Sequence, residues 1–255
     1  MKGRLEGRVA IVTGGGHGIG RAYAMRLASE SARIVVAELD GKAGQAVAEE
    51  LKAAGHEALA VRTDVADPAS ATAMAAAAVK QFGRIDVLVN NAAIFATVPM
   101  SRSPFDEIEI EEWDRMMSVN MKGTWLACRA VIPHMRRQGY GKIINISSST
   151  SIKGSSSRIH YVTSKAGILG FTRTLALEIG KDNICVNCIA PGSTLSEENP
   201  DADVLKMRGD AAGLRALKRV QKPQDLTGAV VFFASADSDF ITGQTLVVDG
   251  GNCLH

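Results

Sequence analysis

Short, continuously apolar segments recur along this chain, and a segment of helical character follows most of them. The first of these, residues 8–13, reads Arg-Val-Ala-Ile-Val-Thr, and its β-branched composition is typical of a strand. Strands that are apolar on both faces belong in a parallel sheet covered by helices, because only there are both faces buried. We expect strands at residues 8–13, 33–38, 58–62, 86–90, 142–146, 184–189 and 246–248.

Helical patterns fill most of the intervals between these strands. The alternation predicts an α/β fold, a Rossmann-like, doubly wound parallel sheet with helices on both faces. A length of 255 residues fits a single dinucleotide-binding domain over residues 1–255. We expect helices at residues 21–29, 42–54, 69–82, 111–138, 162–176 and 223–234.

The most irregular stretch of the chain is residues 191–210, which are rich in Pro, Ser, Asp and Glu. In a doubly wound fold the ligand lies beyond the carboxyl ends of the strands, where long loops gather. We therefore interpret 191–210 as a loop over the substrate. The alternative of a loop that is merely solvated stays open.

Composition and charge exclude several classes of partner. The formal net charge is +2, from 29 basic and 27 acidic residues without a basic block, which gives no reason to expect nucleic acid. No apolar run approaches the roughly 20 residues of a membrane span, and the polar N-terminus does not resemble a signal peptide. Cys185 and Cys188 lie three apart on an expected strand and so point to opposite faces, which argues against a metal site. We expect a cytoplasmic protein with buried, reduced cysteines.

A glycine-rich turn joins the first strand to the first helix. Gly14, Gly18 and Gly20 would let the backbone approach a pyrophosphate, which the amino end of the helix favours electrostatically. Glu38 ends the second strand, where a carboxylate can accept hydrogen bonds from the adenosine ribose and repel the 2′-phosphate of NADP. The turn holds His17 and no Lys or Arg, so NAD is favoured over NADP. Glu38 as an ordinary solvated residue remains the alternative.

Tyr161 and Lys165 lie four residues apart in an expected helix and so share one of its faces. A free tyrosine has a pKa of about 10, and a nearby cation lowers it. Such a tyrosine can take a proton from an alcohol or return one to a ketone, while the Ser148 hydroxyl holds the substrate oxygen. Taken alone, a pair with this spacing is very common and is more often an ordinary helix surface pair.

Together these features resemble the short-chain dehydrogenase/reductase family. The glycine turn has the family's Thr-Gly-x-x-x-Gly-x-Gly form, and Ser148 precedes Tyr161 by thirteen residues, as in the family. The resemblance covers essentially the whole chain. Further matching segments are Asp64-Val65, Asn90-Asn91-Ala92-Ala93, Val119-Asn120, Pro191-Gly192, Ile241-Thr242-Gly243-Gln244 and Val248-Asp249-Gly250-Gly251.

The resemblance implies a catalytic set. Tyr161 would be the general acid and base, and Lys165 would lower its pKa and bind the nicotinamide ribose. Ser148 would orient the substrate oxygen, and Asn120 would hold a water that links Lys165 to solvent. Substrate contacts are expected from Phe95, Ser148, Thr150 and Tyr161.

The resemblance also implies an NAD site without a metal ion. Two positions depart from the family pattern: Ala93 replaces a glycine, and Ser196 replaces a threonine. The residues expected to bind the cofactor are Gly14, His17, Gly18, Ile19, Gly20, Glu38, Asp64, Val65, Asn91, Ala92, Ala93, Tyr161, Lys165, Pro191, Gly192, Thr194 and Ser196.

The sequence indicates the substrate less clearly than the cofactor. Ile94, Phe95 and neighbouring residues suggest a partly apolar pocket, and Lys153 and Arg158 either bind an anionic group or are solvated loop charges. His160 is expected to point away from the reaction and has no assigned role.

The expected function is NAD-dependent oxidation or reduction of a small-molecule secondary alcohol or ketone. Residues 170–176 and 240–251, with the terminal His255, are similar to NAD-linked secondary-alcohol dehydrogenases such as the bacterial phenylethanol dehydrogenases. The alternatives are an NADP enzyme of the 3-oxoacyl carrier-protein reductase type and a non-catalytic NAD(H)-binding regulator. The family also implies a homotetramer, paired through the 111–138 and Tyr161 helices and through the C-terminal helix and strand.

Overall fold

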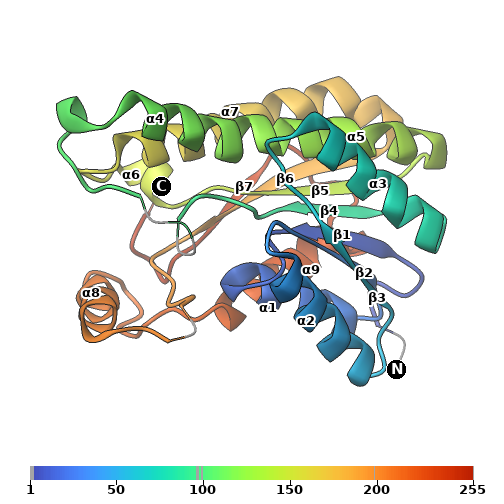
Figure 1. Cartoon of the computed structure of the whole chain (residues 1–255), viewed down its shortest axis with the longest axis horizontal. Helices are drawn as coiled ribbons and strands as arrows, with labels where there is room; N and C mark the ends of the chain where they lie inside the picture. Colours follow the sequence, from blue (N-terminus) through green and yellow to red (C-terminus); the bar gives the residue numbers. More distant parts are fainter. Residues whose placement is uncertain (1–2, 96–97, 99, 198, 255) are drawn as a thin grey trace.

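The computed structural model describes residues 3–95, 98, 100–197 and 199–254. Within these ranges, seven strands form one parallel sheet in the order β3-β2-β1-β4-β5-β6-β7 (Figure 1). His255, singled out in the sequence, lies outside the described residues. The strands are β1 (Val9–Thr13), β2 (Arg33–Glu38), β3 (Ala58–Arg62), β4 (Val87–Asn90), β5 (Gly141–Ile146), β6 (Ile184–Pro191) and β7 (Thr245–Val248).

The strand order reverses direction at β1. The chain runs from β1 outward to β3 and then returns to β4 on the opposite side of β1, so that Ile11 pairs with both Val35 and Leu88. The connections that leave the carboxyl ends of β1 and β4 therefore diverge and open a crevice between them. This is the position at which folds of this kind bind their ligands.

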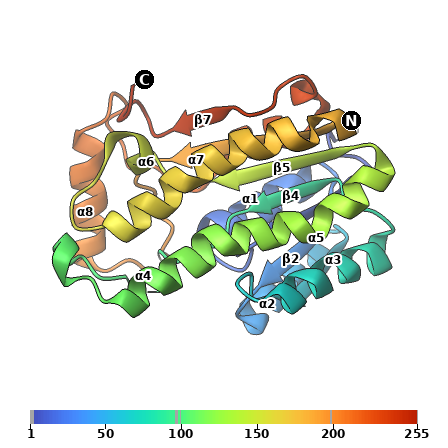
Figure 2. The same ribbon diagram turned by 90° about the horizontal axis from the view of Figure 1, so that it is seen from above.

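Helices cover both faces of the sheet, as Figures 1 and 2 show. One face packs against α1 (Gly18–Ser29), α2 (Gly41–Ala53) and α9 (Gln224–Ala234), and the other against α3 (Pro68–Phe82), α5 (Gly123–Gln138) and α7 (Ile159–Ile179). All residues of β1, β4, β5 and β6 are buried, which explains why these strands are continuously apolar or nearly so. The predicted Rossmann-like α/β fold is confirmed.

The helix that was predicted over 111–138 has an irregular turn near its middle. It consists of α4 (Ile110–Met117), a π-helical segment (Ser118–Lys122) and α5, which follow one another without a break. The π-helical segment contains Asn120. Such single-turn widenings inside α-helices occur frequently at functional sites.

The prediction of an irregular loop over 191–210 was wrong from residue 202 onward. A helix, α8 (Ala202–Gly213), begins there, and the Asp201 side chain caps it by accepting a hydrogen bond from the Val204 amide at 2.8 Å. A shorter helix, α6 (Thr150–Lys153), lies within the Ser/Gly-rich loop that was expected before Tyr161. Both helices lie on the same side of the molecule in Figure 2.

Two further expectations concern burial and the membrane. Cys128, Cys185 and Cys188 are buried and unbridged, as expected for small apolar side chains, and Cys253 is partly exposed.

Among the described residues, no helix has the length and apolar character needed to cross a bilayer.

Candidate active site

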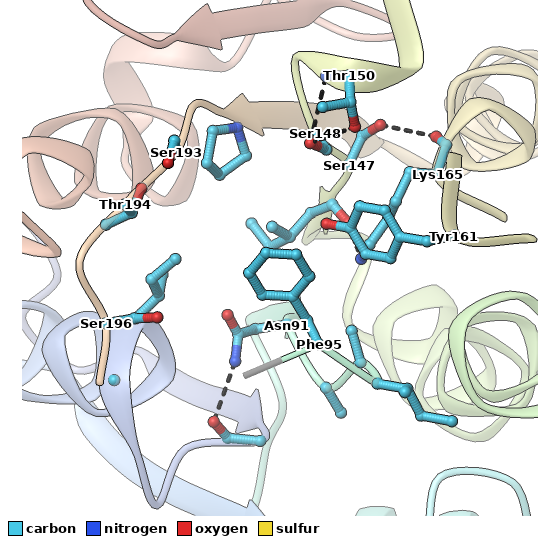
Figure 3. A pocket seen from close by; sticks show the side chains of 18 of the residues that line it. Asn91, Phe95, Ser147, Ser148, Thr150, Tyr161, Lys165, Ser193, Thr194 and Ser196 are labelled. Atoms are coloured by element: carbon cyan, nitrogen blue, oxygen red, sulfur yellow. Dashed lines mark hydrogen bonds between the residues drawn. The ribbon is translucent and has the colours of Figure 1, made fainter. Parts of the chain in front are cut away.

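A cavity of about 490 Å³ lies at the carboxyl ends of the strands, next to the reversal at β1. Its volume is in the range of small-molecule sites. All the residues predicted to bind cofactor or substrate line this cavity, although their roles remain predictions. In Figure 3, Ser193, Thr194 and Ser196 lie along one wall, and Ser148, Tyr161 and Lys165 face them from the other side. Asn120 is the one predicted site residue that is not among the described lining residues.

The glycine turn is packed too tightly to hold side chains. A Cβ atom on Gly20 would lie 1.9 Å from the carbonyl oxygen of Gly14. Gly18 has a φ of +48°, and a Cβ atom there would lie 2.9 Å from the carbonyl oxygen of Ser196. The side chain of the N-cap residue, His17, makes no capping hydrogen bond to the first turn of α1. The turn and the amino end of α1 therefore form a backbone cradle that fits a pyrophosphate.

Glu38 stands at the end of β2 with its carboxylate fixed by backbone amides. One oxygen accepts from Gly16 at 3.0 Å, and the other accepts from Leu39 at 2.8 Å and Asp40 at 3.2 Å. A carboxylate has about four lone-pair positions, so these bonds leave capacity for the hydroxyls of a ribose. Asp64, at the end of the neighbouring strand β3, lines the same part of the cavity.

Asn91 ties the ends of β1 and β4 together. Its side-chain amide donates to the carbonyl oxygens of Thr13 at 3.1 Å and Gly14 at 3.0 Å. The Thr13 hydroxyl accepts in turn from the backbone amides of Asn91 at 3.0 Å and Ala92 at 3.1 Å. These bonds fix the floor of the crevice and the position of the glycine turn. Ala93 also lines the cavity, in the place where the family pattern has glycine.

Tyr161 lies in the first turn of α7 and is only 6% exposed. Its ring lies beside the ring of Phe95 (Figure 3), and the two ring centroids are 5.1 Å apart. Burial raises the pKa of the Tyr161 hydroxyl, whereas a hydrogen bond with Ser148 and the charges of Arg158 and Arg208 act to lower this pKa. The Ser148 hydroxyl is 2.9 Å from that of Thr150, so the two predicted substrate contacts form a pair.

Lys165 is buried one turn further along α7. Its ammonium donates to the carbonyl oxygen of Ile146 at 2.9 Å and lies 5.9 Å from the centroid of the Tyr161 ring. Burial lowers the pKa of Lys165 to about 8. The sequence predicted that Lys165 would lower the pKa of Tyr161, but in this structure burial dominates and the net direction for Tyr161 is upward.

Asn120 connects the substrate side of the cavity to α7. Its side-chain oxygen accepts from the Ile94 amide at 2.9 Å, and its amide donates to the Ser164 hydroxyl at 3.0 Å. The Asn120 side chain therefore holds the neighbour of Phe95 at one end and the neighbour of Lys165 at the other. The predicted water relay through Asn120 stays a prediction.

The wall opposite Tyr161 is built by the end of β6. The Gly192 amide donates to the Val248 carbonyl at 3.1 Å, and the Thr194 hydroxyl donates to the Gly192 carbonyl at 3.1 Å. Pro191, Gly192, Thr194 and Ser196 all face the cavity. The sequence predicted these four residues as cofactor contacts, and that role stays a prediction.

Several lining residues were not singled out in the sequence. They belong to the segment after β4, to α8 and to the C-terminus, and their positions depend on packing between distant parts of the chain. Asp201 is an N-cap residue type, and this helix-start signal could have revealed α8. The additional lining residues include Arg102, Met207, Arg208, Ala211, Leu214 and Asn252.

Comparisons with known proteins match this chain over nearly its whole length. The family model described as enoyl-(acyl carrier protein) reductase matches residues 14–252. The short-chain reductase protein NovJ of Streptomyces niveus is 40% identical over 95% of this chain and 93% of its own length. Trans-4-hydroxycyclohexanecarboxylate dehydrogenase of Sinomonas cyclohexanicum is 38% identical over 97% of this chain and 93% of its own. The 3-oxoacyl-[acyl-carrier-protein] reductase FabG of Thermotoga maritima is 34% identical over 97% of this chain and 98% of its own.

Proposed function

The chain belongs to the short-chain dehydrogenase/reductase family, and we propose that it transfers a hydride between NAD and a secondary alcohol or ketone. The family membership makes it an oxidoreductase that acts on CH–OH groups and takes a nicotinamide cofactor. The observation that carries the finer proposal is the shared cavity of Tyr161, Ser148, Lys165 and the glycine turn.

The cavity fits a nicotinamide dinucleotide on its own geometry. The backbone cradle of the glycine turn suits the pyrophosphate, and Glu38 and Asp64 stand where the adenosine would lie. Lys165 and the Pro191–Gly192 turn would hold the nicotinamide end. When bound, the nicotinamide supplies the hydride chemistry, and the protein supplies geometry and proton transfer.

Proton transfer falls to Tyr161. In oxidation its phenolate takes the hydroxyl proton of the alcohol, and in reduction its phenol returns a proton to the carbonyl oxygen. The Ser148 hydroxyl, paired with Thr150, orients the substrate oxygen toward Tyr161. The buried Lys165 ammonium stabilises the phenolate and the cofactor ribose once both are in place.

The proposal favours NAD over NADP because the adenosine end of the cavity is acidic. A 2′-phosphate would face the Glu38 carboxylate, which three backbone amides hold in position. The described residues of the glycine turn include neither Lys nor Arg to attract such a phosphate. The relative named 3-oxoacyl-[acyl-carrier-protein] reductase supports the second candidate, an NADP enzyme of that type.

The test is NADH formation, followed at 340 nm, with a panel of alcohols at alkaline pH. The panel contains aryl-ethanols, aliphatic alcohols, polyols, hydroxy acids and 3-hydroxyacyl thioesters, each with NAD⁺ and with NADP⁺. We expect turnover of a secondary alcohol with NAD⁺ at least about tenfold above that with NADP⁺, the size of one lost charged hydrogen bond. Glu38→Gln should lower the ratio of turnover with NAD⁺ to turnover with NADP⁺. Glu57→Gln, which changes an exposed residue that is not among the described lining residues, should leave this ratio unchanged.

Each outcome of this panel distinguishes the candidates. Turnover with NADP⁺ alone would contradict the interpretation of Glu38, and a preference for 3-hydroxyacyl thioesters would favour the second candidate. NADH binding without turnover of any alcohol would favour a non-catalytic regulator.

We also propose a homotetramer. Several large apolar side chains are exposed on the helices and strand that the family pattern pairs, among them Trp125 on α5, Leu177 on α7 and Leu246 on β7. Light scattering at micromolar concentration should give four times the chain mass of 26.9 kDa. A monomeric mass would contradict this assembly.

A further inference from the structure

Acidic and basic side chains are distributed unevenly along the cavity. Among the described residues, the acidic lining residues are Glu38 and Asp64, both at the adenosine end. Three arginines, Arg102, Arg158 and Arg208, lie near one another at the end that holds Tyr161. The other basic side chains on the described lining are Arg115, Lys153 and Lys165. A cavity that accepted only neutral alcohols would not need this positive end.

Arg158 lies at the start of α7, three residues before Tyr161. Its guanidinium donates to the hydroxyl of Ser155 from both Nε and an Nη atom, and among the described residues it has no carboxylate within ion-pair distance. Arg102, on the segment after β4, contacts the Met207 sulfur at 3.4 Å and likewise has no carboxylate partner in the described part of the chain. Both cations are therefore available to a ligand.

Arg208 is different because its charge is already paired. It is 4% exposed, forms an ion pair with Glu197, and donates to the Ser193 hydroxyl at 3.0 Å. Its guanidinium lies 5.9 Å from the centroid of the Phe95 ring, which lies 5.1 Å from that of Tyr161. The buried Nε of Arg208 has no hydrogen-bond partner among the described residues. Arg208 thus fixes the α8 side of the positive end and leaves one donor unused.

The grouping of these arginines is unfavourable without an anion. Burial, and then the like charges of Arg102 and Arg208, lower the pKa of Arg158. Arg158 is partly buried and Arg102 is exposed, and neither has a carboxylate partner among the described residues. A guanidinium is suited to a carboxylate because its two parallel N–H groups match the two oxygens. A ligand carboxylate would supply the missing counter-charge.

We propose that the positive end binds a carboxylate of the substrate, through Arg158 and Arg102, so that the substrate is a hydroxy acid or the corresponding keto acid. This inference rests on the proposed function, and it names the substrate class. The carboxylate would fix one end of the molecule while Ser148 and Tyr161 receive its hydroxyl. Phe95, between Tyr161 and Arg208, would cover the apolar part of the substrate.

The experiment measures binding, so that it does not depend on turnover. Ligand-observed NMR titrations give dissociation constants for cyclohexanecarboxylate and benzoate, for their uncharged amides, and for inorganic phosphate, with and without NADH. The variants are Arg158→Gln, Arg102→Gln and the charge-retaining Arg158→Lys. Lys80→Gln, which removes an exposed cation on α3 outside the described lining residues, is the matched control, and circular dichroism checks folding.

We expect the carboxylates to bind the wild type and Lys80→Gln at least about tenfold more tightly than the amides, as for a charged hydrogen bond. Arg158→Gln and Arg102→Gln should each reduce this preference, and Arg158→Lys should retain part of it. Equal binding of acids and amides, or a preference that survives both neutral substitutions, would overturn the proposal. Tighter binding of phosphate than of either carboxylate would overturn it in favour of a phosphorylated substrate. These dissociation constants do not depend on turnover. Failure of the proposed function, in which no alcohol is oxidised, can therefore be distinguished from failure of the carboxylate site.

Discussion

Tyr161→Phe is expected to bind NADH as the wild type does and to lose at least a hundredfold in turnover. The ring is buried against Phe95, so phenylalanine fills the same space and only the hydroxyl is removed. General acid–base catalysis contributes typically 10²- to 10⁴-fold, which sets the scale of the loss. Turnover would be measured with the best alcohol of the panel, and NADH affinity by the change in its fluorescence.

The matched control is Tyr140→Phe. Tyr140 lies outside the described lining residues of the cavity, with the Arg8 guanidinium 3.9 Å from its ring centroid, and losing its hydroxyl should leave turnover unchanged. Substantial activity of Tyr161→Phe would refute the assignment of Tyr161.

The pH profile of the wild type is a second readout of the same group. The phenolate is the form that accepts the proton in oxidation, and burial raises the pKa of Tyr161, so the oxidation rate should rise toward alkaline pH. Burial lowers the pKa of Lys165 to about 8, so Lys165 also titrates on the alkaline side. We expect the two groups to titrate as a coupled pair because they lie one turn apart on α7. A flat profile while chemistry limits the rate would count against this mechanism, and the rising limb should be absent from Tyr161→Phe.

Much of the fold could be predicted because its signals are local in the sequence. A strand buried on both faces must be apolar throughout, so β1 and β2 were found within one residue at each end. The glycine turn, Glu38 and the Tyr161–Lys165 pair are likewise encoded by spacing within single elements. Their meeting in one cavity then follows from the parallel sheet, whose carboxyl ends lie at one edge.

The features that could not be predicted depend on contacts between distant segments. Arg208 looks like a solvated residue of an irregular stretch, yet it is buried because Glu197, Ser193 and Phe95 surround it. The upward direction of the Tyr161 pKa arises from burial by neighbouring elements, which helical spacing does not reveal. The π-helical turn at Asn120 depends on contacts between segments, because the hydrogen bonds of the Asn120 side chain to Ile94 and Ser164 join three parts of the chain.

Gly20→Ala is expected to weaken NADH binding by about tenfold to a hundredfold and to lower the melting temperature, because overpacking of this kind costs roughly 1–3 kcal/mol. The new Cβ atom would lie 1.9 Å from the Gly14 carbonyl oxygen and 2.5 Å from the Asn91 side-chain nitrogen. Neither group can move freely, since Gly14 belongs to the turn itself and Asn91 joins β1 to β4. The turn must therefore open, and the backbone amides that would hold the pyrophosphate lose their alignment.

Gly209→Ala is the matched control for this effect. Gly209 lies in α8, and no heavy atom lies within 4 Å of the position that its Cβ would take. Alanine is favoured over glycine inside a helix by roughly 1 kcal/mol, so this variant should keep NADH affinity and melt no lower than the wild type. If Gly20→Ala bound NADH as tightly as Gly209→Ala does, the glycine turn would not be the cofactor cradle. The proposed roles of Tyr161 and Glu38 would then lose the support that they take from a cofactor bound at the glycine turn.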